Sequence, residues 1–269
     1  MNAQTKLRKK TEKGLHICVG LDTDINKIPV HLRESKNSLL EFNKAIINAT
    51  ANEAVSYKIN FAFYESLGIP GMQTLEETIS CIPSDVLIIA DAKRGDIGNT
   101  SKMYAQSVFD YFKCDSVTLH PYMGYESVEP FLEYEDKISF ILGLTSNSSA
   151  KDFEKQKLES GEFLYQKVIS KTSEWNTRNN CGLVFGATNL EELQNNISSF
   201  EDMPILLPGV GAQGGSLEDV VATFESNSKS NFLINVSRAL IYCDGSENFE
   251  QIVKKTITDY NITIKSLLA

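Results

Sequence analysis

The stretch that decides the fold is Asp85-Val-Leu-Ile-Ile-Ala-Asp-Ala-Lys-Arg-Gly-Asp-Ile-Gly-Asn-Thr100. Its apolar beginning, Asp85–Ala90, predicts a strand that is buried on both faces, as in a parallel sheet. Side chains two residues apart on a strand point to the same side, so Asp91 and Lys93 share a face. Charges directly after a buried strand are costly to desolvate unless they pair, and such a cost usually marks a functional site. The alternative is a solvated strand end with an ordinary surface ion pair.

Short apolar runs recur on both sides of this stretch, with amphipathic segments between them. Strands are expected at His16–Leu21, Ala54–Asn60, Asp85–Ala90, Ser116–Leu119, Ile138–Leu144, Gly182–Gly186, Pro204–Leu207 and Phe232–Val236. Helices are expected at Ser38–Asn52, Gly71–Cys81, Glu162–Asn176, from Asn189, at Ser216–Phe224, near Arg238 and at Phe249–Leu268. A further helix is expected to be capped by Asn99 or Thr100 and to bury Met103, Val108, Phe109 and Phe112.

Eight strands, each followed by a helical segment, predict an α/β fold, a single (β/α)₈ TIM barrel over residues 1–269. Residues 1–14 would form an N-terminal arm and residues 246–269 a terminal helix. A doubly wound open sheet is the alternative. That fold places a Gly-x-Gly-x-x-Gly turn after its first strand, where this chain has Leu21-Asp-Thr-Asp24.

Composition excludes several classes of protein. The chain has 269 residues, 42% hydrophobic and 23% charged, which is an ordinary globular composition. Its net charge of -9 argues against nucleic-acid binding, and no apolar stretch is long enough to cross a membrane. The five cysteines are scattered and never form a Cys-x-x-Cys pair, as is typical of a reducing compartment. These features predict a cytoplasmic protein with neither a nucleic-acid nor a membrane partner.

In a barrel, reactive groups gather at the C-terminal ends of the strands. These ends carry Asp22, Lys58 and Asn60, Asp91 and Lys93, His120, and Thr145 and Ser146. Neighbouring opposite charges would keep Lys93 an ammonium and Asp91 a carboxylate. A lone His before Pro, such as His120, is more often a structural residue than a general base. Neither a metal-ligand spacing nor a Ser-His-Asp arrangement is found.

The last two strand ends predict a phosphate site. The segment Pro208-Gly-Val-Gly-Ala-Gln-Gly-Gly215 follows the seventh strand, and Arg238 opens a short helix after the eighth. Glycines let backbone amides approach an anion, a helix end adds partial positive charge, and arginine can bond two oxygens.

The segment Asp91-Ala-Lys93-Arg-Gly-Asp96-Ile-Gly-Asn-Thr100 resembles the Asp-x-Lys-x-x-Asp signature of the orotidine 5′-phosphate decarboxylases. Further segments resemble the longer, type 2 branch of that family: Leu21–Asp24, Tyr57–Tyr64, Leu144–Asn147, Pro208–Gly215 and Asn235–Arg238. The resemblance implies decarboxylation of orotidine 5′-monophosphate to UMP in pyrimidine nucleotide synthesis, without a cofactor or metal.

The resemblance also implies roles for single residues. Lys93 would protonate C6, Asp91 would lie beside the departing carboxylate, and Lys58 would tie these charges to Asp22 and the ribose, with Asn60 close by. Asp96 and Thr100 would reach into the partner's site in a homodimer. Thr145 or Ser146 would contact the pyrimidine, Pro208 would line the pocket, and Gln213 and Arg238 would hold the phosphate.

Three other functions remain open from the sequence. A metal-dependent sugar-phosphate decarboxylase or aldolase of the same barrel superfamily shares much of the signature. A Schiff-base aldolase could use Lys58 or Lys93, although adjacent carboxylates keep a lysine protonated and non-nucleophilic. A nucleotide-binding module without activity is the third.

Overall fold

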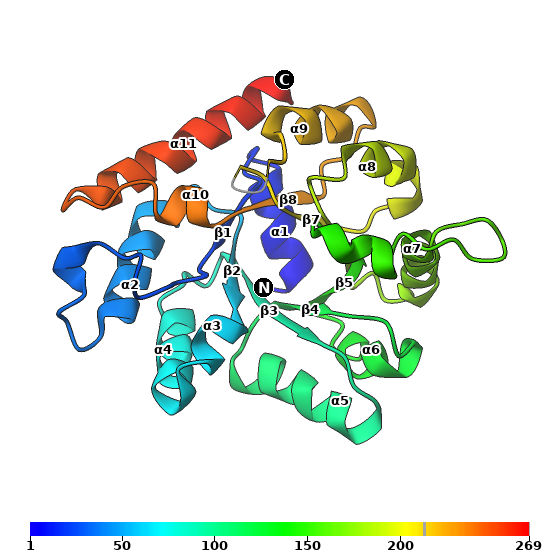
Figure 1. Ribbon diagram of the computed structural model, residues 1–269, viewed down its shortest axis with the longest axis horizontal. Helices are drawn as coiled ribbons and strands as arrows, with labels where there is room; N and C mark the ends of the chain where they lie inside the picture. The colour runs from blue at the N-terminus through cyan, green and yellow to red at the C-terminus, as the bar shows by residue number, and fades with distance from the viewer. Residues whose placement is uncertain (212–213, 269) are drawn as a thin grey trace.

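The computed structural model describes residues 1–211 and 214–268. Eight parallel strands pair in sequence order, and β8 closes the sheet against β1 (Figure 1). The predicted (β/α)₈ barrel is therefore confirmed. The strands are β1 (Ile17–Gly20), β2 (Ser56–Asn60), β3 (Leu87–Arg94), β4 (Ser116–Leu119), β5 (Ile138–Leu144), β6 (Cys181–Phe185), β7 (Ile205–Pro208) and β8 (Phe232–Val236).

Helices surround the barrel (Figure 1). They are α2 (Ser38–Thr50), α3 (Phe61–Glu65), α4 (Gly68–Ser80), α5 (Gly98–Ala105), α6 (Tyr125–Leu132), α7 (Leu164–Trp175), α8 (Leu190–Asn196), α9 (Leu217–Ser226), α10 (Arg238–Ile241) and α11 (Phe249–Leu267). Short 3₁₀ turns occur at Val30–Leu32, Ser148–Asp152 and Ile197–Phe200, and a π-helix at Gln106–Tyr111 continues α5. None of the helices formed by the described residues is long and apolar enough to cross a membrane.

Apolar side chains pack in two separate layers because every strand is buried on both faces. The outer layer lies between the strands and the surrounding helices. The inner layer fills the barrel with residues such as Leu87, Ile89 and Phe140. Leu87, Ile89 and Asp91 alternate along β3 and therefore point to the same side, into the barrel. The Asp91 carboxylate thus lies next to the apolar interior of the barrel.

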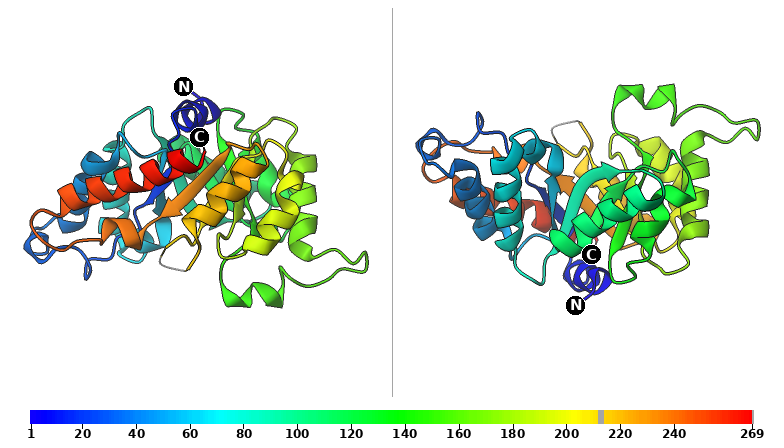
Figure 2. Two further views of the ribbon diagram at one scale, coloured as in Figure 1. Left: turned by 90° about the horizontal axis from the view of Figure 1, so that it is seen from above. Right: turned by 90° about the horizontal axis from the view of Figure 1, so that it is seen from below.

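The N-terminal arm is an ordered helix, α1 (Ala3–Thr11), that lies across one end of the barrel (Figures 1 and 2). Ala3 and Leu7 join the inner apolar layer. The Lys6 ammonium donates to both carboxylate oxygens of Asp115, at 2.9 and 2.8 Å, and Asp115 also accepts the backbone N–H of Ile88 at 2.9 Å. Lys6 therefore anchors the arm to the sheet.

The helix after Gly95 differs from its prediction at two points. It begins at Gly98 after Ile97 without a side-chain cap, so Asn99 and Thr100 lie inside its first turn. Met103 is 48% exposed, whereas Val108, Phe109 and Phe112 are buried as predicted. The buried residues of α5 are Ser101 and Ala105, two positions before and after Met103, and at about 3.6 residues per turn Met103 points to the opposite side.

The stability of the fold is expected to fall in acid because His16, directly before β1, is buried. Its ring stacks on Phe232 at 4.0 Å, and its Nδ1–H donates to the Phe232 carbonyl at 3.0 Å. Burial lowers the pKa of His16 from 6.5 to about 4, although the hydrogen bond acts in the opposite direction. Between these two values the unfolded chain binds a proton that the native chain does not, so stability falls as pH decreases through this window.

The expected loss at His16 is about 3 kcal/mol of the free energy of unfolding between pH 7 and pH 4. Urea unfolding of the wild type and of His16→Gln, at matched protein concentrations across this range, measures it. The variant should be less stable at pH 7 but should lose less stability on acidification. Parallel pH profiles would contradict the assignment.

Candidate active site

A cavity of about 270 Å³ opens at the C-terminal ends of the strands. This is the end opposite α1, where the segment 145–163 projects from the barrel (Figure 2). Apolar side chains of Leu142, Val184 and Leu206 form part of its wall. Most of the predicted site residues also line it, namely Asp22, Lys58, Asn60, Asp91, Lys93, Thr145, Ser146 and Pro208.

Four of these side chains, Asp22, Lys58, Asp91 and Lys93, form a continuous charged network. Lys58 Nζ donates to Asp91 Oδ2 at 2.8 Å and lies 3.3 Å from Asp22 Oδ1. Lys93 Nζ donates to the other oxygen of Asp91, Oδ1, at 2.6 Å. The side chains of Lys58 and Asp91 are only 5% and 9% exposed, so this is not an ordinary surface ion pair.

The charged network keeps its buried members ionised. Burial by itself raises the pKa of the Asp91 carboxyl, but the ammonium groups of Lys58 and Lys93 outweigh burial and hold that pKa well below its usual range. Burial also disfavours the charged form of Lys58. Asp91 and Asp22 outweigh it, so the pKa of Lys58 is raised. The cavity therefore presents a fixed carboxylate between two positive charges.

Lys93 reaches the cavity through an irregularity in β3. The register between β3 and β4 shifts between Ala90 and Arg94, and Lys93 has a φ of 45°, in the left-handed region. Strain of this kind at a non-glycine residue is common at functional sites. The Lys93 N–H donates to Thr118 Oγ1 at 3.0 Å, and that hydroxyl donates to Asp91 Oδ1 at 3.0 Å. Thr118 therefore positions both charged residues.

A carboxylate from the following loop holds the end of β5. Glu154 accepts the N–H of Thr145 at 2.7 Å and the hydroxyl of Thr145 at 2.8 Å. The Thr145 hydroxyl also lies 2.6 Å from Asn147 Oδ1, and the Asn189 amide donates to the Thr145 carbonyl at 3.0 Å. The Thr145 side chain is thus held by protein partners at the edge of the cavity, which both Thr145 and Ser146 line.

The segment after β7 has a backbone suited to an anion. Gly209, Gly211 and Gly214 have φ values of 107°, 75° and 89°, which only glycine adopts without strain. Pro208, at the end of β7, lines the cavity. Arg238 is exposed and begins α10 directly after β8. Because α10 is a single turn, the charge of Arg238 matters more for anion binding than the helix dipole.

Four predicted site residues are not found among those that line the cavity. Asp96 is partly exposed and accepts the N–H of Ile97 at 2.8 Å. Thr100 is exposed in the first turn of α5. Arg238 lies at the same end of the barrel, beyond the cavity lining. Gln213 lies outside the described residues.

Sequence reasoning missed several residues that line the cavity: Thr118, Leu142, Asn147, Val184, Leu206 and Asn235. All except Asn147 belong to strands β4 to β8. An alternation signal was available at Thr118, which lies two residues before His120. For apolar strands that are buried on both faces, however, alternation does not show which face points inward.

His120 has a structural environment. Its backbone N–H donates to the Arg94 carbonyl at 3.0 Å, and its ring packs over Gly95, where a Cβ would lie 2.4 Å from the ring.

Within residues 1–211 and 214–268, no group of three or more His, Cys, Asp and Glu side chains is arranged to hold a metal ion.

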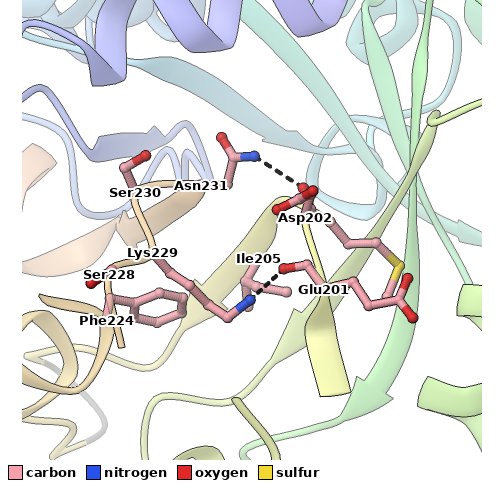
Figure 3. Close-up of a pocket in the computed structure, with 9 residues that line it drawn as sticks. Glu201, Asp202, Ile205, Phe224, Ser228, Lys229, Ser230 and Asn231 are labelled. Atoms are coloured by element: carbon pink, nitrogen blue, oxygen red, sulfur yellow. Dashed lines mark hydrogen bonds between the residues drawn. The ribbon is translucent and has the colours of Figure 1, made fainter. Parts of the chain in front are cut away.

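A smaller pocket of about 100 Å³ lies at the other end of the barrel, between the turns that precede β7 and β8 (Figure 3). Lys229 donates to the Glu201 carbonyl, and the Asn231 amide donates to the Asp202 carbonyl at 3.0 Å. These side chains hold the two turns together, so their role is structural.

Comparisons with known proteins agree on one family. The sequence model of the Orotidine 5'-phosphate decarboxylase / HUMPS family matches residues 15–250. The orotidine 5′-phosphate decarboxylase of Phocaeicola vulgatus is 47% identical over 255 residues, covering 94% of this chain and 93% of that protein. That of Dehalococcoides mccartyi is 49% identical over 238 residues, covering 87% and 86%.

The solved structure of Leishmania donovani OMP decarboxylase has a TM-score of 0.81 and 31% identity to this chain. The match covers 97% of this chain and 100% of that chain. With the charged network at the expected strand ends, these similarities lead to one conclusion. The chain belongs to the orotidine 5′-phosphate decarboxylase / HUMPS family.

Proposed function

We propose that this chain decarboxylates orotidine 5′-monophosphate to UMP and carbon dioxide in the synthesis of pyrimidine nucleotides, with no cofactor or metal. The observation that carries this proposal is the charged network, in which Asp91 contacts both Lys58 and Lys93 within hydrogen-bond distance. Relatives that bear the decarboxylase name and share nearly half of the sequence support it.

The reaction breaks the bond between C6 and the carboxylate and leaves the electron pair on C6. This carbanion lies in the ring plane and cannot delocalise into the π system, so the protein must stabilise it electrostatically. Lys93 supplies the positive charge nearest to this carbanion. Its side chain is 50% exposed, and its ammonium group contacts Asp91. Its ammonium donates a proton to C6, and solvent then reprotonates the amine.

Asp91 and Lys58 prepare the site for this step. The Asp91 carboxylate lies beside the departing carboxylate and fixes the Lys93 ammonium. Repulsion of the substrate carboxylate by Asp91 is a minor contribution, because ground-state destabilisation is a contested effect. Lys58 ties Asp91 to Asp22 and to the ribose hydroxyls, with Asn60 close by in the lining of the cavity.

The two ends of the substrate occupy separate parts of the barrel mouth. The pyrimidine contacts Thr145 or Ser146, which both line the cavity. Pro208 lines the pocket, and Arg238 and Gln213 hold the phosphate. Binding energy from the phosphate can close the 209–215 loop over the site and exclude water from the reaction.

The active unit is a homodimer in which Asp96 and Thr100 serve the partner's site. Exposed apolar side chains occur in and beside α5 and on the loops after β4 and β5, at Ile97, Met103, Tyr122, Met123 and Phe153, and the ring centroids of Tyr122 and Phe153 lie 6.4 Å apart. These side chains are between 44% and 80% exposed. Exposed apolar side chains near Asp96 and Thr100 favour a protein interface there. A second copy of the chain packed against these side chains would bring Asp96 close to the partner's charged network.

A cytoplasmic location fits this activity and the state of the thiols. All five cysteines are free. Burial raises the pKa of Cys18, Cys114 and Cys181 to about 12, so these thiols are inert.

Activity on orotidine 5′-monophosphate should survive complete removal of metal ions. The change in ultraviolet absorbance as the substrate becomes UMP measures the rate with untreated protein and with protein in excess EDTA. Equal rates are expected, because the charged network rather than a metal stabilises the carbanion. Loss of activity in EDTA that magnesium restores, or turnover of a sugar phosphate alone, would favour the metal-dependent alternative.

A further inference from the structure

The hydroxyl of Tyr242 bridges two loops that are far apart in sequence. It accepts the N–H of Asp24 at 2.7 Å and donates to the carbonyl of Asp22 at 3.3 Å. Its ring stacks on Phe42, with centroids 5.8 Å apart and an angle of 12° between the planes. Burial raises the pKa of Tyr242, so the hydroxyl stays protonated. Tyr242 does not line the cavity described above.

Tyr242 belongs to the segment that begins with Arg238. It follows the single turn of α10, and its N–H donates back to the Arg238 carbonyl at 3.2 Å. From Asp22, the charged network continues through Lys58 and Asp91 to Lys93. A chain of direct contacts therefore runs from the residue that would hold the phosphate to the residue that would protonate C6.

The loop after β1 is also held by contacts that do not involve Tyr242. The hydroxyl of Thr23 donates to Asn43 Oδ1 at 2.6 Å, and the Asn43 amide donates to Tyr64 Oη at 2.9 Å. Tyr64 in turn donates to the Leu21 carbonyl at 3.2 Å. This buried network anchors the loop to the neighbouring helices. The Tyr242 hydroxyl adds a separate link, whose effect is to tie the loop to α10.

We propose that Tyr242 is a positioning residue that couples phosphate binding at Arg238 to the placement of Asp22 and the charged network. The inference rests on the proposed binding of the substrate phosphate by Arg238. A ligand with a phosphate holds α10 in place, and Tyr242 passes this constraint to the loop that carries Asp22. A ligand without a phosphate gains nothing from this link.

The test compares UMP with uridine as competitive inhibitors, because the two differ only in the phosphate. Tyr242→Phe keeps the ring on Phe42 and removes the hydroxyl. We expect it to raise the Ki of UMP about 3- to 10-fold, the effect of one lost hydrogen bond, and to leave the Ki of uridine within about 2-fold. In an Arg238→Ala background, the same substitution should change neither Ki by more than about 2-fold.

Each other outcome has a distinct meaning. Equal increases in both Ki values would show that Tyr242 only supports Asp22 locally, and this would overturn the coupling. An undiminished effect of Tyr242→Phe on UMP in the Arg238→Ala background would also overturn it. If Arg238→Ala itself leaves the ratio of the two Ki values unchanged, the phosphate-binding role of Arg238 fails instead. Tyr134→Phe is the matched control, because it removes a hydroxyl that donates only to Asp110 on the outside of the barrel.

Discussion

Replacing Lys93 with alanine is expected to lower kcat for orotidine 5′-monophosphate by at least about 10⁴-fold, since it removes both the proton donor and the nearest positive charge. Asp91 loses one of its two ammonium partners but keeps Lys58 at 2.8 Å, so the carboxylate stays paired and the fold persists. UMP should still bind, because the phosphate and pyrimidine contacts remain. Absorbance assays give the rate, and calorimetric titration with UMP gives the affinity.

Lys254→Ala is the control for Lys93→Ala. Lys254 is exposed on α11, outside the barrel, and does not line the cavity, so its loss should leave kcat unchanged. Turnover of Lys93→Ala close to that of the wild type would contradict the assignment of the proton donor. Loss of UMP binding together with a lower melting temperature would show that the variant tests the fold rather than the chemistry.

Mixing Lys93→Ala subunits with Asp96→Ala subunits is expected to restore activity that neither variant has alone. In a hybrid dimer, one site combines an intact Lys93 with an intact Asp96 from the partner, and the other site lacks both. Random assortment of equal amounts makes half of the dimers hybrids with one working site, which gives about a quarter of the wild-type activity. Coexpression with two different affinity tags isolates the hybrids for assay.

A control mixture of Lys93→Ala and Asp91→Ala subunits tests whether recovery of activity requires a site shared between subunits. Lys93 and Asp91 contact each other within one barrel, at 2.6 Å, so a hybrid of Lys93→Ala and Asp91→Ala has two defective sites and should stay inactive. Recovery in that mixture, or none in purified Lys93→Ala and Asp96→Ala hybrids, would contradict the proposed contribution of Asp96 to the partner's site.

Local patterns were sufficient to predict most of the barrel. Strands β4, β5 and β8 have the predicted bounds, because a short apolar run between polar turns is a local signal. The predicted burial of Met103 and the predicted cap of α5 by Asn99 or Thr100 were wrong, because local patterns do not show how a helix packs on the barrel. An apolar residue on a helix is buried only if its face meets the barrel, and Met103 points away from that face.

Contacts between distant parts of the chain could not be predicted in the same way. The lysine-rich arm gives no sequence sign that Lys6 will pair with Asp115, which lies 109 residues away. Alternation from His120 points to Thr118 but does not predict what Thr118 contacts. Its role depends on the bulge at Lys93 and on the neighbouring strand that brings Asp91 within 3.0 Å.

The sequence by itself determined that this chain forms a (β/α)₈ barrel and which strand ends carry its charges. Both follow from patterns within a few residues, the apolar run and the alternation of side chains along a strand. Only the tertiary structure decided which charges meet. Lys58 lies between Asp22 and Asp91, which are 36 and 33 residues away in the chain, because β2 pairs with β1 on one side and with β3 on the other.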